Sequence, residues 1–188
     1  NNAEFIKLRK NVFHDVMQEG DRFVVHKTVA DHIGTEEAVQ YLEFGVFTGE
    51  SILTWAESLN RNPNSRFVGF DTFTGLPEDW TKSTPKGTFD VEGKLPQTTD
   101  DRVSFVPGLF QNTLEPFLDH RFVRDVPTVV HIDCDLYSAT LFVLSSLHRV
   151  LPQGSYVIFD DFYSMNHEFR AFLDFTRAFN CNWVPIAS

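Results

Sequence analysis

The sequence predicts an α/β fold in which a mostly parallel sheet is covered by helices on both faces. Short runs rich in Val, Ile and Phe alternate along the chain with segments whose apolar residues recur at three- and four-residue spacing. This alternation is typical of a parallel sheet, because parallel strands need long crossover connections. With 188 residues, 42% of them hydrophobic, the chain can bury a substantial core. We therefore expect a single domain over residues 1–188.

The predicted elements follow an N-terminal helical segment, residues 1–40. In that segment one helical pattern ends at Gly20, and a second, Phe23–Ile33, ends before Gly34. The predicted strands are Tyr41–Phe44, Arg66–Phe70, Val103–Val106, Val126–Ile132, Tyr156–Phe159 and Trp183–Ile186. The predicted helices between them are Ser51–Leu59, Thr113–Leu118, Ala139–Leu151 and Glu168–Phe179. Right-handed crossovers bring the carboxyl ends of the strands to one edge of the sheet, where ligands bind in such folds.

A long segment, residues 75–102, interrupts this alternation. It contains Pro, Gly, Thr and charged residues without clear periodicity. Loops of this length are uncommon in compact domains and often cover binding sites. Because the segment directly follows the end of the second predicted strand, we predict a lid; a surface insertion without function is the alternative.

The end of the first predicted strand carries a glycine-containing turn, in the sequence YLEFGVFTGESI. Gly45 and Gly49 allow a ligand to approach the backbone closely, and the helix that starts near Ser51 offers free N–H groups. Asp71 follows Gly49 by 22 residues and ends the second predicted strand. Nucleotide-binding α/β units hold ribose hydroxyls with a carboxylate at this position. The pair predicts a nucleotide-like cofactor.

Acidic residues follow two further predicted strands. The sequences VVHIDCDLY and YVIFDDFY place Asp133, Asp135, Asp160 and Asp161 at strand ends that we expect to be neighbours. Converging carboxylates repel one another unless a cation neutralises them, and all-oxygen ligands favour Mg²⁺ or another hard divalent ion. Helix capping is the alternative role for each single aspartate.

Composition excludes some classes of partner. A net charge of −10 without a basic tract argues against binding to nucleic acid or to an anionic membrane surface. No apolar run approaches the roughly 18 residues of a membrane span. The start of the sequence lacks the apolar region of a signal peptide. Cys134 and Cys181 lack metal-ligand spacing and are expected to be free thiols, which fits a cytoplasmic protein.

In combination, several motifs resemble a known enzyme family. They are EFGVFTGES, FDTFTGLPE, VPGLFQNTL, HIDCDLYSAT and LPQGSYVIFDDF. They are similar to class I S-adenosylmethionine (SAM)-dependent, metal-dependent O-methyltransferases, and most similar to the macrocin/mycinamicin O-methyltransferase group. The resemblance covers about Tyr41 to Phe162. It implies a Rossmann-like class I methyltransferase fold, SAM and Mg²⁺ as cofactors, and a small-molecule hydroxyl as methyl acceptor.

The resemblance also implies roles for the matching residues. Ser51 would meet the methionine carboxylate and Asp71 the ribose. The full cofactor-binding set would be Glu43, Gly45, Val46, Phe47, Gly49, Ser51, Asp71, Gly108, Phe110, Gln111 and Asp133. The metal ligands would be Asp133, Asp160 and Asp161. Asp133 and Asp135 are the candidate catalytic residues, with Asp135 as the base that accepts the hydroxyl proton.

Two departures and several alternatives accompany this interpretation. Phe47 replaces the middle glycine of the common GxGxG turn, and Leu136 replaces a lysine of the catechol enzymes. The absence of that lysine argues against a catechol. We expect a sugar- or polyol-like acceptor, because two adjacent hydroxyls can chelate one metal. The DxD motif after an apolar strand also fits an aspartate-nucleophile phosphatase or a glycosyltransferase, and the glycine turn with Asp71 also fits a dehydrogenase. A non-catalytic nucleotide- or SAM-binding module is a further alternative. The N-terminal helices could pack across a homodimer.

Overall fold

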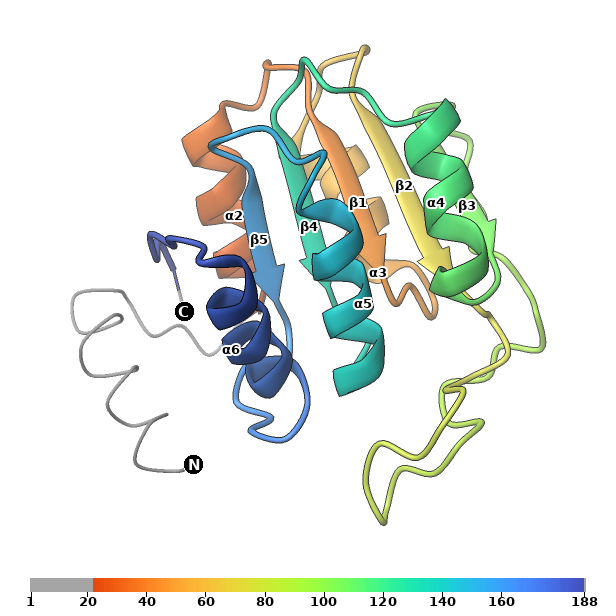
Figure 1. Ribbon diagram of the computed structural model, residues 1–188. Coiled ribbons are helices and arrows are strands. Elements are labelled where there is room, and N and C mark those ends of the chain that lie inside the picture. The colour runs from red at the N-terminus through yellow and green to blue at the C-terminus, as the bar shows by residue number, and fades with distance from the viewer. Residues whose placement is uncertain (1–21, 188) are drawn as a thin grey trace.

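The computed structural model describes residues 22–187, and the predicted helix that ends at Gly20 lies outside this range. Five strands form one parallel sheet in the order β3-β2-β1-β4-β5 (Figure 1). Their bounds are β1 Gln40–Phe44, β2 Arg66–Asp71, β3 Val103–Pro107, β4 Thr128–Ile132 and β5 Tyr156–Phe159. The order reverses between β1 and β4, which is the switch point where such sheets bind ligands. The predicted fold class is confirmed.

Helices cover both faces of this sheet. Figure 1 shows α4, α5 and α6 on the near face, while α2 and α3 lie on the opposite face. The bounds are α2 Arg22–Ile33, α3 Glu50–Thr54, α4 Phe110–His120, α5 Tyr137–Leu147 and α6 Glu168–Phe179. The predicted helix Ser51–Leu59 is divided, because α3 continues into a π-helical turn over Trp55–Leu59. None of the helices in residues 22–187 combines the length and hydrophobicity that a membrane crossing requires.

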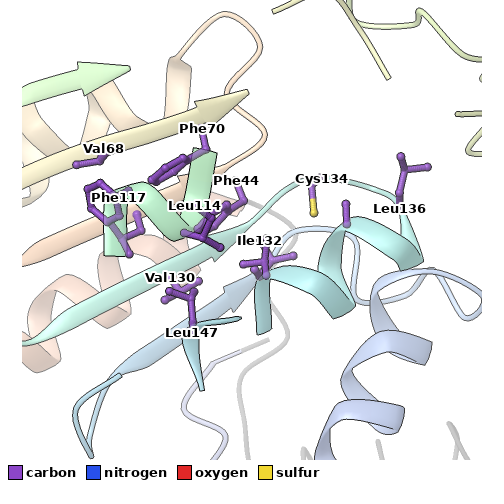
Figure 2. Packing of buried hydrophobic residues seen from close by; sticks show 13 residues of the cluster. Phe44, Val68, Phe70, Leu114, Phe117, Val130, Ile132, Cys134, Leu136 and Leu147 are labelled. Atoms are coloured by element: carbon purple, nitrogen blue, oxygen red, sulfur yellow. The ribbon is translucent and has the colours of Figure 1, made fainter. Parts of the chain in front are cut away.

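The two layers of helices enclose two cores, and β1 contributes to both. Leu42 and Phe44 face α4 and α5, where Phe44 stacks on Phe70 with ring centroids 4.9 Å apart (Figure 2). Tyr41 faces the other way, into the core that includes Trp55. All five residues of β1 are buried, including the polar Gln40 and Glu43, so the strand does not alternate between buried and exposed positions.

The predicted sixth strand, Trp183–Ile186, is wrong. Within the described part of the chain this segment has no sheet partner. Trp183 packs on Phe172 of α6, with ring centroids 5.3 Å apart, and its indole N–H donates to Thr176. The apolar character that suggested a strand therefore serves contacts with a helix.

The connection between β2 and β3 contains the predicted lid. Figure 1 shows it projecting beyond the carboxyl ends of the strands. At its base, the Leu76 N–H donates to the Thr88 carbonyl oxygen, and the Gly87 N–H donates to the Leu76 carbonyl oxygen. At its far end, the Arg102 guanidinium donates to the carbonyl oxygens of Asn60 and Asn62. The segment is thus tied down at both ends, and its role as a lid stays a prediction.

Candidate functional site

A pocket of about 360 Å³ lies at the carboxyl edge of the sheet, between the β1 turn, the lid and the ends of β4 and β5. It brings together nine of the predicted site residues, namely Gly45, Phe47, Asp71, Phe110, Gln111, Asp133, Asp135, Asp160 and Asp161. Five other predicted cofactor residues do not line it: Glu43, Val46, Gly49, Ser51 and Gly108. The role of each predicted residue stays a prediction, but most of them share one cavity.

The turn after β1 depends on the absence of a side chain at Gly45. This residue has a φ of +93°, and a Cβ added there would lie 1.8 Å from the carbonyl oxygen of Asp133. Only glycine allows both the left-handed conformation and this approach. Gly49 has a φ of +87°, and an added Cβ would lie 2.8 Å from Pro96 of the lid. The glycine turn is therefore held between the end of β4 and the lid segment.

Asp71 holds this turn through hydrogen bonds. Its Oδ2 accepts the backbone N–H groups of Val46 (2.7 Å) and Phe47 (2.9 Å). Its Oδ1 accepts the N–H of Phe73 at 2.9 Å. The Thr72 hydroxyl lies 3.5 Å from Oδ1 but donates its one proton to the Gly75 carbonyl oxygen at 2.9 Å. Of the about four acceptor positions of a carboxylate, one therefore remains for a ligand hydroxyl. Asp71 thus shapes the turn as well as facing the pocket.

Glu43 lies below the pocket in a buried polar network. The Tyr41 hydroxyl donates to Glu43 Oε2 at 2.6 Å, and His131 Nδ1 lies 3.2 Å from the same oxygen. Burial alone would lower the pKa of His131, but its contacts with Asp160 and Glu43 raise that pKa to about 10. The two carboxylates on either side of His131 therefore favour its protonated form.

Arg22, the first residue of α2, extends this network to the pocket. Its Nη2 donates to Asp133 Oδ2 at 2.6 Å, and its Nε lies 3.1 Å from Asp160 Oδ1. Asp160 Oδ1 also lies 3.8 Å from His131 Nε2. Burial would raise the pKa of Asp160, yet the contacts with His131 and Arg22 lower it. We call the alternating series Glu43, His131, Asp160, Arg22 and Asp133 the charge row.

A second acidic group lies beside the charge row. Asp135 has a φ of +60°, and burial, followed by its hydrogen bond with Asp161, raises its pKa to about 8. The buried Glu168 accepts the backbone N–H of Asp161 at 3.1 Å. Burial and the charge of Asp161 raise the pKa of Glu168 well above its ordinary value. The surroundings of Asp135 and Glu168 therefore favour their protonated forms, whereas the contacts of Asp160 favour its ionised form.

The pocket's position at the switch point, its glycine turn and its acids can be compared with known proteins. Residues 42–162 match the family described as "Methyltransferase domain", which is well over half of the chain. The chain belongs to this methyltransferase family. This supports SAM-dependent methylation and favours the predicted enzyme over the phosphatase, glycosyltransferase, dehydrogenase and non-catalytic alternatives.

Solved structures agree with this fold. The methyltransferase is similar to CalS11, a calicheamicin methyltransferase, with a TM-score of 0.58 and 24% identity over 84% of this chain and 68% of that one. It is also similar to the O-methyltransferase NovP, with a TM-score of 0.61 and 19% identity over 88% of this chain and 74% of that one. At these identities the similarity establishes the fold. No curated protein sequence matches the chain.

The pocket of the methyltransferase fits SAM in its chemistry. One part is lined by apolar side chains, including Phe47, Leu109 and Phe110, which suit a flat adenine ring. Asp71 retains an acceptor position for a ribose hydroxyl, and Asp133 is a carboxylate that suits the methionine ammonium.

The predicted metal ligands fit a hard cation in type but are already engaged. Asp133 and Asp160 both pair with Arg22. Within residues 22–187, the only group of three or more His, Cys, Asp or Glu residues with ligand atoms within 4.8 Å of one another is His26, His131 and Asp160. This set does not suit a metal, because the Trp55 indole N–H donates to His26 Nδ1 at 2.7 Å and so leaves the proton on Nε2. The Mg²⁺ site stays a prediction that requires Arg22 to move.

Sequence reasoning missed Arg22, although it pairs with two predicted metal ligands. Asp133 is 111 residues away along the chain. The sequence around Arg22 contains no recognisable motif, so no local pattern identifies this residue. Only the packing of α2 beside the end of the sheet brings Arg22 to the two aspartates.

Proposed function

We propose that this methyltransferase transfers the methyl group of SAM to a hydroxyl oxygen of a small molecule, and that it is a metal-dependent enzyme of the macrocin/mycinamicin type. The observation that carries the proposal is one pocket that joins the glycine turn and Asp71 to the strand-end acids under a lid. The acceptor class we favour is sugar- or polyol-like, or a related natural product. A structure similar to this chain, at 22% identity and a TM-score of 0.54, is described as a TDP-rhamnose 3'-O-methyltransferase, CalS11.

SAM supplies a methyl group on a positively charged sulfur, which is already a strong electrophile. The protein's task is then to position the donor and acceptor in line and to remove one proton. Asp71 would hold the ribose and Asp133 the methionine ammonium. In the transfer the sulfur–carbon bond would break, an oxygen–carbon bond would form, and the hydroxyl proton would pass to Asp135 in its ionised form, whose population rises as the pH approaches the pKa of about 8.

Asp133, Asp160 and Asp161 are the residues that would hold Mg²⁺. A divalent cation at these carboxylates would lower the pKa of an acceptor hydroxyl beside Asp135. Two adjacent hydroxyls on the acceptor suit such a cation, which is why we favour a sugar or polyol. This assignment rests on the oxygen donors, since Arg22 pairs with two of the three residues.

The lid supplies the acceptor's side of the pocket. Trp80 and Phe89 line the cavity, and the Trp80 indole N–H is buried without a hydrogen-bond partner among residues 22–187. A buried donor of this kind is costly unless a ligand oxygen pairs with it. Ser138 of α5 donates to Glu78, which ties the lid to the helix after the acids. We infer that Trp80 donates to an acceptor oxygen.

The first test separates the cofactor from the metal. Calorimetric titration with S-adenosylhomocysteine should show binding with Mg²⁺ and also with EDTA. Absence of binding in both conditions would contradict the proposal for this chain.

The second test addresses the acceptor and the base. Transfer of labelled methyl from SAM to a panel of sugars and polyols should depend on Asp135 but not on the exposed Asp31. Asp135→Asn is the suitable variant, because asparagine tolerates the left-handed conformation at this position. Full activity of Asp135→Asn would remove Asp135 as the base, while methylation of only nitrogen or carbon acceptors would overturn the O-methyltransferase assignment.

A further inference from the structure

We propose that Arg22 is the resident counter-ion of the strand-end carboxylates, and that a divalent cation binds Asp133 and Asp160 only after displacing its guanidinium. This inference rests on the metal assignment of the proposed function. It adds a competition that ties metal binding to the start of α2.

The contacts of Arg22 carry the inference. The guanidinium reaches the ends of two adjacent strands, with Nη2 2.6 Å from Asp133 Oδ2 and Nε 3.1 Å from Asp160 Oδ1. Nη2 also donates to Ser51 Oγ at 3.0 Å. The two carboxylates are about three-quarters or more buried, so these ion pairs are only partly screened by solvent. Arg22 therefore fills the position between the carboxylates at which a shared cation would have to bind.

Arg22 supplies positive charge to both strand-end carboxylates. Its guanidinium lies 2.6 Å from Asp133 Oδ2 and 3.1 Å from Asp160 Oδ1. The expectation that these acids need a metal assumed that no side chain neutralises them. Arg22 removes part of that need, so the free enzyme is expected to bind divalent cations weakly.

A divalent cation and the guanidinium exclude each other at this site. Mg²⁺ binds carboxylate oxygens at about 2.0–2.1 Å. An ion held by Asp133 Oδ2 and Asp160 Oδ1 would lie a few ångströms from Arg22, with charges of the same sign in a partly buried site. The apparent affinity for the metal is reduced in proportion to the fraction of molecules in which Arg22 does not occupy the two carboxylates. Removal of Arg22 should therefore strengthen metal binding by the inverse of that fraction.

The test is Mn²⁺ binding without SAM, measured from the electron paramagnetic resonance signal of free Mn²⁺ and by calorimetry. Arg22→Gln should bind Mn²⁺ roughly tenfold or more tightly than the wild type. Lys27→Gln is the matched control, because Lys27 lies in the same helix and pairs with Asp31 instead. It removes the same charge and should change the affinity less than about twofold. Adding Asp160→Asn to Arg22→Gln should abolish the gain.

Equal Mn²⁺ affinity of Arg22→Gln and the wild type would overturn the inference, as would absence of Mn²⁺ binding in every variant. S-adenosylhomocysteine binding is measured separately in EDTA. Loss of S-adenosylhomocysteine binding would contradict the proposed function. If S-adenosylhomocysteine binds and the Mn²⁺ affinity of Arg22→Gln is unchanged, only the proposed role of Arg22 is contradicted.

A second measurement uses the wild-type protein and so does not depend on the folding of a variant. In protein labelled with ¹⁵N-arginine, the Arg22 Nε–H resonance is assigned by its absence from Arg22→Lys. Saturating Mg²⁺ should move this resonance to the position of a solvent-exposed arginine. An unmoved resonance in protein that calorimetry shows to be loaded with Mg²⁺ would overturn the displacement.

Discussion

The two sides of the pocket are built from different interactions. On the β1–β2 side, backbone geometry sets the shape: Gly45 lies against the carbonyl of Asp133, and Asp71 accepts the N–H groups of the turn. On the β4–β5 side, charged side chains set the shape, because the charge row links Glu43 of β1 and His131 of β4 to Arg22 and the two strand-end aspartates.

This difference determines how each side responds to change. A backbone turn packed against another backbone has no room for an added atom. A row of ion pairs can rearrange, lose a proton or exchange one cation for another. The first side is therefore suited to holding a cofactor, and the second to chemistry that depends on charge.

The largest effect is expected from Gly45→Ala, which tests the β1–β2 side of the pocket. Its Cβ would lie 1.8 Å from a carbonyl oxygen, so we expect a loss of about 3 kcal/mol or more in the free energy of unfolding, with loss of S-adenosylhomocysteine binding. Urea denaturation and calorimetry measure these. The control is Gly87→Ala, at a similar φ of +87° but with no atom within 4 Å of the added Cβ. It should cost only about 1 kcal/mol. Equal losses of unfolding free energy in the two variants would show that the positive φ, and not the close backbone contact, causes the loss at Gly45.

Asp160→Asn tests the ionic side. It removes the carboxylate charge that both Arg22 and His131 contact. We expect Mg²⁺-dependent methyl transfer to fall by about a hundredfold or more, while S-adenosylhomocysteine binding is spared. Activity assays across a Mg²⁺ series, with exposed Asp31→Asn as control, measure this. Full activity with an intact cation requirement would show that the metal assignment is wrong.

Asp71→Ala should weaken S-adenosylhomocysteine binding by roughly ten- to a hundredfold, equally with Mg²⁺ or EDTA. The variant removes the acceptor of the Val46 and Phe47 N–H groups, and a lost charged hydrogen bond costs about 1.5–3 kcal/mol. Calorimetry under both conditions checks it. Weaker S-adenosylhomocysteine binding in Mg²⁺ but not in EDTA would show that Asp71 acts with the metal, which contradicts the division of the pocket into a backbone side and an ionic side.

The smallest effect concerns pH. Because the folded-state pKa of His131 is raised to about 10 from the usual 6.5, its contribution to stability is complete below pH 6.5 and is lost as pH rises through 10. We expect the free energy of unfolding in EDTA to fall by more than about 1 kcal/mol between pH 7 and pH 10. Glu43→Gln removes one of the carboxylates that raise this pKa, so its decline should start at lower pH. Parallel curves for both proteins would refute a charged His131.

The same comparison explains what the sequence could predict. The five strands and the glycine turn follow from local patterns, since burial on both faces and a positive φ leave direct traces in residue type. The spacing from Gly49 to Asp71 reflects one strand–helix–strand unit. The turn was therefore predictable in position and in its use of glycine.

The ionic side was predictable only in part. Strand ends revealed Asp133 and Asp160, but the cation between them comes from a helix whose packing no local pattern specifies. Likewise, the apolar run at Trp183 was compatible with a strand or with packing on α6, and only tertiary contacts distinguish the two. Charge compensation between distant segments is the physical information that a single sequence lacks.

The direct pairing of Glu43 with His131 also has a consequence for how the chain folds. The two residues are opposite each other in the register of β1 and β4, strands that must find each other across a long stretch of chain. A slip of one residue would turn either side chain to the opposite face and bury both charges apart, and an unpaired buried charge typically costs about 3–5 kcal/mol. The ion pair thereby selects one alignment of the two central strands and disfavours misaligned sheets during folding.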